Sequence, residues 1–379
     1  MLRLTEEQRM LVDTVRRITQ EKIAPRAEEI DEKEEFPYDI VDLFREIGLL
    51  GFPLEVPEGR KENVLTCCLI LEEIAKVCSN SAHALAAQWL GMTPIKIASN
   101  EEQAEKFFPL LRSRLAAFSL TETEAGSDAG GVRTKAVRDG NGYVLNGSKC
   151  FCTDGHVADF VTIFARTDPD LKSGTRGLSA FIVEKGTPGF TIGKLERQMG
   201  MRGTTACEII LDDCRVPGEN LLGNEGDGFK IAMQTLDRTR PKDAAIAVGI
   251  AQGAIDVALN YAKERKQFGQ PIAEFQAIQF MLSDMATQIE AARLLTHKAA
   301  WLIDEGTPNS MYSSMANYFA TDAAVEVTNQ AMLVLGGYGY MKDFPLERKL
   351  RDAKLLQIVE GTNQIQRLIV ARNLIGSKG

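Results

Sequence analysis

The chain has 379 residues, 44% of them hydrophobic, and a formal net charge of −8. A chain of this length exceeds one usual hydrophobic core, so we expect two or three packed domains. The negative charge provides no general attraction for nucleic acid or anionic lipid, which argues against a nucleic-acid partner. No stretch approaches the ~20 apolar residues of a membrane span, and the residues after Met1 lack a signal-peptide pattern. We therefore expect a cytoplasmic protein without membrane insertion.

The first part of the chain, residues 1–115, has the periodicity of amphipathic helices. Pro37, Pro53 and Pro57 divide this part into separate helices. The periodic apolar positions are Leu11, Val15, Ile18, Ile23, Val41, Leu43, Phe44, Ile47, Leu50, Leu69, Leu71, Ile74 and Val77. We predict an N-terminal helical domain.

Residues 116–225 have the texture of a β domain, because short β-branched and aromatic runs alternate with Gly, Asn and Asp turns. The Asn146-Gly147 pair is a hairpin signal. Strands are expected at 160–164, 178–183 and 208–211. We predict a small β-barrel or sandwich without crossover helices.

The helical period returns at residues 226–379, where two apolar stripes predict a C-terminal helical domain. Helices with two apolar faces also suggest subunit contacts, so an oligomer is expected. The predicted fold class is α+β multidomain, with a helical domain on each side of the β domain.

The cysteines and histidines do not form a metal or disulfide pattern. Seven cysteines are an odd number in a large chain of intracellular character, which favours free thiols. Cys150 and Cys152 lack the C-x-x-C spacing of a zinc or redox site, and the three histidines are scattered. We expect no metal site.

Two glycine-rich segments resemble nucleotide-binding loops only superficially. The stretch 142–149 ends in Ser148 and Lys149, the reverse of the Walker order, and is typical of a hairpin. The stretch 336–339 lacks the G-x-G-x-x-G spacing, and no βαβ unit surrounds it. A nicotinamide-binding Rossmann domain is therefore unsupported.

Five segments in a fixed order carry a specific resemblance. They are 118–128 (FSLTETEAGSD), 237–241 (DRTRP), 264–269 (ERKQFG), 335–339 (LGGYG) and 359–367 (VEGTNQIQR). Each is weak alone, but together with the helix–β–helix layout they span almost the whole chain. The chain resembles the acyl-CoA dehydrogenase family, and its motifs are closest to those of the short- and medium-chain members.

The resemblance implies an FAD-dependent oxidoreductase that converts an acyl-CoA thioester to the trans-2-enoyl-CoA, as in fatty-acid or alicyclic-acid degradation. It implies that the C-terminal domain is a four-helix bundle and that the enzyme is a homotetramer, arranged as a dimer of dimers. It also implies that the electrons pass to an electron-transferring flavoprotein.

Glu360 is the candidate catalytic base. It precedes Gly361, which permits close backbone approach, and Thr362 or Asn363 can cap a helix that begins near Ile365. From the residues alone, a carboxylate in a capping region is the ordinary interpretation. By resemblance, Glu360 takes the α-proton of the thioester while FAD accepts the β-hydride. Such a base needs burial that raises its pKa toward the working pH.

The resemblance also assigns the FAD site, partly across a subunit boundary. Thr121 reaches the pyrimidine end of the flavin, and Thr153 lies near flavin N5. Phe151 stands where tryptophan is usual, and Leu333 where some relatives have glutamine. The assigned residues are Phe118, Leu120, Thr121, Gly126, Ser127, Phe151, Thr153, Arg265, Gln267, Phe268, Gln276, Leu333, Gly336, Gly337, Thr362 and Gln364.

A further set is assigned to the acyl-CoA substrate. Asp237 and Arg240 take the CoA nucleotide by resemblance, although two such charges on a helix also form ordinary surface ion pairs. The full set is Ser127, Asp237, Arg240, Trp89, Leu90, Val359 and Gly361.

The acyl specificity is a hypothesis from two positions. Val359 stands where tyrosine is common, which widens the pocket near the reacting carbons, whereas Trp89 and Leu90 shorten its far end. We expect a short branched or alicyclic acyl group, such as cyclohexanecarboxyl. A straight short- or medium-chain acyl group is the alternative.

Other functions on the same scaffold fit the sequence less well. An oxygen-reactive acyl-CoA oxidase is disfavoured by the chain length, and a flavin monooxygenase by the presence of Glu360. A non-catalytic adaptor is expected to lack Glu360 or Thr121, and both are present.

Overall fold

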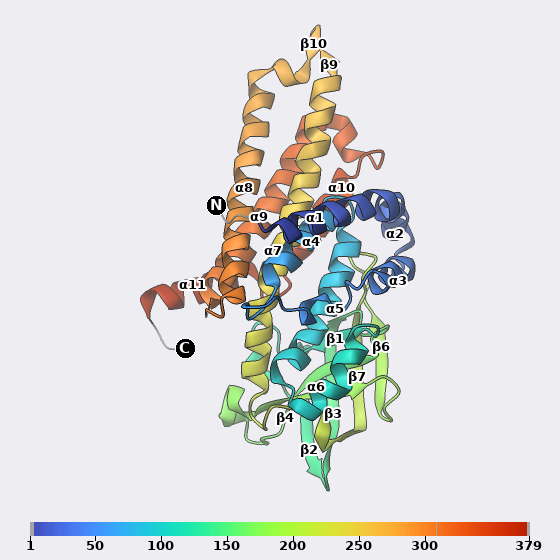
Figure 1. The fold of residues 1–379 in the computed structure, drawn as a ribbon, viewed down its shortest axis with the longest axis vertical. Coiled ribbons are helices and arrows are strands. Elements are labelled where there is room, and N and C mark those ends of the chain that lie inside the picture. The colour runs from blue at the N-terminus through green and yellow to red at the C-terminus, as the bar shows by residue number, and fades with distance from the viewer. Residues whose placement is uncertain (1–3, 308, 377–379) are drawn as a thin grey trace.

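The computed structural model describes residues 4–307 and 309–376. The chain forms a helical N-terminal part, a β-sheet part and a C-terminal part of long helices, in that order (Figure 1). The long helices stand above the sheet in this view, and the N-terminal helices lie beside both. The helix–β–helix architecture expected from the sequence is confirmed.

The described residues of the N-terminal part form six α-helices. A capping box at Thr5 and Gln8 starts the first, and Asn100 with Gln103 starts the last in the same way. Helix α5 is buried along nearly its whole length, because other helices and the sheet cover it. The helices are α1 (Glu6–Ile18), α2 (Ala27–Lys33), α3 (Tyr38–Glu46), α4 (Val64–Ala75), α5 (Ser79–Ala98) and α6 (Glu101–Leu111).

The β part is one hydrogen-bonded sheet of eight strands, so the expected barrel or sandwich is observed as a single sheet. The strands run in the order β6-β7-β3-β2-β4-β5-β8, and β1 pairs with β4. The pairings of β4 with β1 and β2 are parallel and the others are antiparallel. The strands are β1 (Ala116–Ser119), β2 (Lys135–Asp139), β3 (Gly142–Thr153), β4 (Phe160–Arg166), β5 (Leu178–Glu184), β6 (Phe190–Leu195), β7 (Ala206–Pro217) and β8 (Leu221–Leu222).

The sheet buries two faces in different ways. Tyr143, Val161 and Phe181 belong to a core enclosed by the strands themselves. Phe160 and Phe164 alternate with Val161 along β4 and join the larger core under the helices. The alternation follows from the period of two in a strand, and it fixes the sheet against the helical parts.

The C-terminal part is built around one long central helix, α7. Between Thr239 and Ala251 every residue of α7 is buried, because α4, α5, α8 and α9 pack against it. Its most apolar window has the composition of a membrane span, but 67% of that window is buried inside the protein, as in a core helix. The elements are α7 (Gly228–Glu264), β9 (Lys266–Gln267), β10 (Gln270–Pro271), α8 (Gln276–Asp304), α9 (Ser310–Leu335), α10 (Leu346–Leu356) and α11 (Asn363–Ile375).

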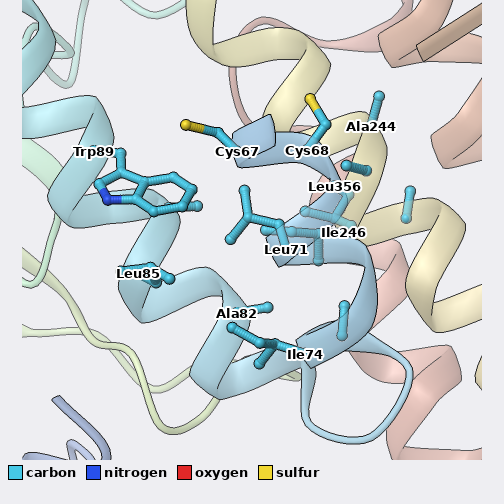
Figure 2. Packing of buried hydrophobic residues seen from close by; sticks show 14 of the residues in the cluster. Cys67, Cys68, Leu71, Ile74, Ala82, Leu85, Trp89, Ala244, Ile246 and Leu356 are labelled. Carbon is cyan, nitrogen blue, oxygen red and sulfur yellow. The ribbon is translucent and has the colours of Figure 1, made fainter. Parts of the chain in front are cut away.

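The contact between α4, α5 and α7 forms the centre of the larger core (Figure 2). Cys67, Leu71 and Trp89 lie on facing sides of α4 and α5, and Ile246 approaches from α7. All seven cysteines of the chain are free thiols, as expected.

Candidate active site

Glu360 lies in the short connection between α10 and α11, in a left-handed backbone conformation. Its φ is 59°, and the φ of the following Gly361 is 93°. A non-glycine residue in this region costs about 1–3 kcal/mol and persists only where the surroundings impose it. Helix α11 begins at Asn363 with Thr362 as its N-cap, close to the predicted position. The strained turn therefore points to a functional constraint at Glu360.

Three side chains hold Glu360 in place from two sides. The Arg240 Nε–H and the Gln366 Nε2–H both donate to the Glu360 carbonyl oxygen, at 3.2 and 2.9 Å. The Thr239 hydroxyl donates to Glu360 Oε2 at 2.7 Å. Both backbone and carboxyl group are thus fixed by helices α7 and α11, so the acid cannot swing freely.

The carboxyl of Glu360 has the electrostatics of a base that works near neutral pH. Burial raises its pKa to about 7, although the Thr239 hydrogen bond and the charges of Arg240 and Lys242 act in the opposite direction. A carboxylate whose pKa is near 7 binds a proton strongly enough to remove one from a substrate. At neutral pH about half of these carboxyl groups are ionised and able to act as the base.

Replacing Thr239 by valine is expected to raise the pKa of Glu360, because the lost hydroxyl stabilises the ionised carboxylate. The base is active when ionised, so kcat/KM of the wild type rises with pH through about 7. In the variant this rise moves to higher pH. The pH profile of kcat/KM measures the shift. Thr235→Val, one turn earlier on α7 with a buried unpaired hydroxyl, is the matched control and keeps the wild-type profile.

Strand β1 and the segment that follows it carry five of the predicted flavin residues. Gly126 and Ser127 are exposed, whereas Leu120 is buried and Phe118 and Thr121 are half-buried. Two buried residues, Glu122 and Lys149, stabilise this segment.

Glu122 and Lys149 form a buried ion pair in the β part. Lys149 Nζ lies 2.7 Å from Glu122 Oε1 and also donates to the Leu120 carbonyl oxygen at 3.1 Å. Glu122 accepts further hydrogen bonds from the backbone of Arg133 and Thr134. The pair ties 120–122 to 133–134 and so fixes the loop between them.

Strand β3 ends with the next two predicted flavin residues. The Phe151 ring is 63% exposed, and its backbone has a positive φ of 56°. Thr153 follows on the same strand and is half-buried, while Cys152 between them points into the sheet core. The exposed aromatic ring of Phe151 and the nearby hydroxyl of Thr153 are consistent with a surface that binds a planar ligand.

A second group of predicted FAD residues lies at the far end of α7. Arg265, Gln267, Leu333, Gly336 and Gly337 line a common hollow of about 550 Å³. Phe268 is 94% exposed and Gln276 is also exposed, and both lie outside the residues that line the hollow.

The predicted substrate and cofactor residues near the Glu360 turn differ in their burial and contacts. Asp237 is half-buried and accepts a hydrogen bond from Arg240 at 2.9 Å, and Arg240 is buried against the Glu360 backbone. Thr362 and Gly361 belong to the turn itself, and Gln364 is exposed on the first turn of α11. A role of Asp237 and Arg240 toward CoA stays a prediction, whereas their contacts to one another and to the turn are seen directly.

The two pocket-shortening residues on α5 have different surroundings. Trp89 is fully buried and donates its indole N–H to the Leu49 carbonyl oxygen at 2.9 Å. Leu90 is half-buried, and Val359 packs against the edge of the larger core. The contacts of Trp89 are those of a core residue, so its role toward substrate stays a prediction.

Two residues of the site were not singled out by the sequence. Thr239 and Gln366 contact Glu360 directly, yet each looked like an ordinary polar residue of a helix. Both lie inside segments that carried the family resemblance, 237–241 and 359–367. Their position within these two segments was the only feature of the sequence that could have indicated a role in the site.

Models of one protein family match three consecutive parts of the chain. Residues 5–114 match "Acyl-CoA dehydrogenase, N-terminal domain", residues 117–214 the middle domain and residues 226–375 the C-terminal domain.

Curated relatives match along the full length. A cyclohex-1-ene-1-carbonyl-CoA dehydrogenase of Geobacter metallireducens is 49% identical over 99% of this chain and 100% of the relative. A cyclohexane-1-carbonyl-CoA dehydrogenase of the same organism is 45% identical over 99% of both chains.

Solved structures have the same fold. Butyryl-CoA dehydrogenase from Megasphaera elsdenii is 41% identical, with a TM-score of 0.95 over 99% of this chain and 100% of that one. A chain from a study of the electron transferring flavoprotein of Acidaminococcus fermentans is 46% identical, with a TM-score of 0.95 over all of both chains. A glutaryl-CoA dehydrogenase from Mycobacterium smegmatis in complex with FADH2 is 26% identical, with a TM-score of 0.91 over 99% and 96%.

Proposed function

The chain belongs to the acyl-CoA dehydrogenase family, and we propose that its substrate is a short branched or alicyclic acyl-CoA, such as cyclohexanecarboxyl-CoA. As a member, it catalyses acyl-CoA dehydrogenation, an oxidation of a CH–CH bond. The observation that supports this chemistry best is the buried carboxyl of Glu360, held by Thr239 with a pKa of about 7.

In the proposed reaction, the residues at the Glu360 turn carry out the proton transfer from the substrate. The Glu360 carboxylate takes the α-proton of the thioester, and Thr239 holds Oε2 so that one oxygen stays directed. Within the described residues the backbone N–H of Glu360 makes no hydrogen bond, so it is free to bind the thioester oxygen as negative charge develops. Arg240 and Gln366 hold the carbonyl oxygen of the same residue and so help to fix the turn that carries this N–H.

We propose FAD as the cofactor, and the residues fit it. The exposed Phe151 ring and the Thr153 hydroxyl suit the flavin, and the fork of Arg265 beside the 550 Å³ hollow suits a pyrophosphate. When bound, FAD supplies the acceptor for the two electrons that leave with the β-hydrogen.

We propose the homotetramer, a dimer of dimers, that the family resemblance implies, and the two groups of FAD residues support an assembly of at least two chains. Arg265 follows Arg240 by 25 residues and directly follows α7, so at ~1.5 Å per residue it lies about 37 Å from Arg240 along the helix axis. Arg240 contacts the Glu360 turn, where the flavin ring is proposed to lie. One FAD cannot reach both places in one chain, so a second chain would supply the far group. A mass of four chains by light scattering is expected; a mass of two chains would contradict the tetramer, and a monomer would also contradict the shared FAD site.

The acyl specificity is supported by Val359 and by the relatives. Valine beside Glu360 leaves more room near the reacting carbons than a phenol would. Two relatives at 45–49% identity are described as dehydrogenases of cyclohexane- and cyclohexene-carbonyl-CoA.

Steady-state rates across a panel of thioesters test this specificity. We expect kcat/KM for cyclohexanecarboxyl-CoA to exceed that for octanoyl-CoA at least about tenfold, equivalent to ~1.4 kcal/mol. Val359→Tyr should reduce the value for the cyclic thioester more than for butyryl-CoA, because the phenol refills the space. A preference for straight chains of eight carbons or more would refute the proposal and leave the straight-chain alternative.

We also propose an electron-transferring flavoprotein as the electron acceptor and the cytoplasm as the location. The similarity to a chain from the electron transferring flavoprotein study supports the former. Reduced enzyme that persists in air with product bound would support this acceptor over an oxidase reaction, whereas rapid reoxidation by dioxygen would contradict it.

A further inference from the structure

Asp243 is a second buried acid beside the Glu360 carboxyl. It lies four residues after Thr239 on α7, so the two share one face of the helix with Cβ atoms roughly 5–6 Å apart. Thr239 is the residue whose hydroxyl binds the Glu360 carboxylate. We therefore expect the acyl group that Glu360 deprotonates to lie near Asp243 as well.

Asp243 has no hydrogen-bonding or ion-pairing partner among residues 4–307 and 309–376. It is 6% exposed, and within the described residues its carboxyl makes no hydrogen bond and no ion pair. The adjacent Lys242 forms no ion pair with Asp243 within the described residues, and its Nζ lies 5.8 Å from the centre of the Trp89 ring. Buried polar groups are almost always hydrogen-bonded, so an unpaired one beside a reaction centre calls for a ligand group.

The surroundings favour the neutral form of this acid. Burial raises the pKa of Asp243 well above its usual range, and the nearby charge of Glu360 raises it further, whereas Lys242 acts in the opposite direction. A neutral carboxyl group can donate one hydrogen bond through its O–H and accept others through its oxygens. A hydroxyl group also both donates and accepts, so the two groups are complementary.

We propose that Asp243 is a specificity residue that binds a hydroxyl group on the acyl part of the substrate. The inference rests on the proposed function and narrows it to hydroxylated acyl thioesters, among them hydroxylated alicyclic ones. A purely hydrocarbon acyl group leaves the buried carboxyl unpaired, and sites built to bind a hydroxyl reject analogues that lack it.

An ammonium group on the substrate is the weaker alternative. It requires Asp243 to be ionised next to the ionised Glu360, and it adds a third cation to a region that already holds Arg240 and Lys242. A hydroxyl needs no such charge change.

The test compares kcat/KM within matched pairs of thioesters, using the FAD-loaded full chain and an artificial dye as electron acceptor. The cyclic pairs are cyclohexanecarboxyl-CoA against its 3- and 4-hydroxy isomers, and the straight pair is pentanoyl-CoA against 5-hydroxypentanoyl-CoA. We expect the wild type to prefer at least one hydroxylated member about tenfold or more. In Asp243→Val this ratio falls to one or below, and in Asp243→Asn, which keeps shape and hydrogen bonding, part of it remains.

Asp256→Val replaces an exposed aspartate on the same helix and keeps the wild-type ratio. A wild type without a hydroxyl preference in any pair overturns the inference, as does an Asp243→Val enzyme that retains it. A stronger preference for 4-aminocyclohexanecarboxyl-CoA also overturns it in favour of charge recognition. If all rings are refused and straight chains accepted, the proposed ring specificity fails, and the straight pair still decides the role of Asp243.

Discussion

Glu360→Gln lowers kcat for acyl-CoA dehydrogenation by about 10²- to 10⁴-fold, the usual contribution of a general base. Glutamine keeps the size of the side chain and can still accept the Thr239 hydrogen bond, but it cannot take the α-proton. The backbone of the turn remains held by Arg240 and Gln366. Single-turnover reduction of the enzyme-bound flavin by substrate measures the loss directly.

The purified Glu360→Gln enzyme should retain its flavin and bind substrate, because the residues assigned to FAD are unchanged. Glu326→Gln, an exposed carboxylate on α9, is the control and keeps wild-type activity. Turnover within about tenfold of wild type in Glu360→Gln would mean that another group takes the proton. A wild-type chain that cannot hold any flavin would refute the cofactor assignment itself.

The architecture could be predicted from the sequence because it depends on local patterns, whereas the role of Glu360 as the base is a prediction from the family resemblance. The helical and strand periods locate the three parts, and a carboxylate before Gly361 marks the turn. Each of these signals is contained within a short stretch of chain.

The contacts that make the site work could not be predicted in the same way. Thr239, Gln366 and Asp243 matter because α7 and α11 meet at the Glu360 turn, and that meeting is a product of tertiary packing. The parallel pairing of β1 with β4 likewise joins segments more than 40 residues apart. No local pattern reports such proximity, so an ordinary threonine or aspartate on a helix gives no signal by itself.

Lys149→Met destabilises the fold by about 3–5 kcal/mol, because it leaves the buried Glu122 carboxylate without its counter-ion. The Lys149 side chain is fully buried, and burial lowers its pKa to about 8 despite the opposing effect of Glu122. Burial also raises the pKa of Glu122, but the Lys149 charge and hydrogen bonds outweigh it and leave this pKa below its usual range. The pair is therefore ionised at neutral pH. Urea denaturation measures the change in the free energy of unfolding.

The double variant Glu122→Gln/Lys149→Met separates the lost pair from a general packing defect. It removes both charges, so it should recover a large part of the stability lost in Lys149→Met. Lys135→Met, on the exposed face of β2, is the control and changes stability little. If the double variant is as unstable as the single one, the role of the ion pair is wrong. If the ion pair holds the 120–134 loop, Lys149→Met should also weaken FAD binding, because that loop presents Thr121 and Ser127.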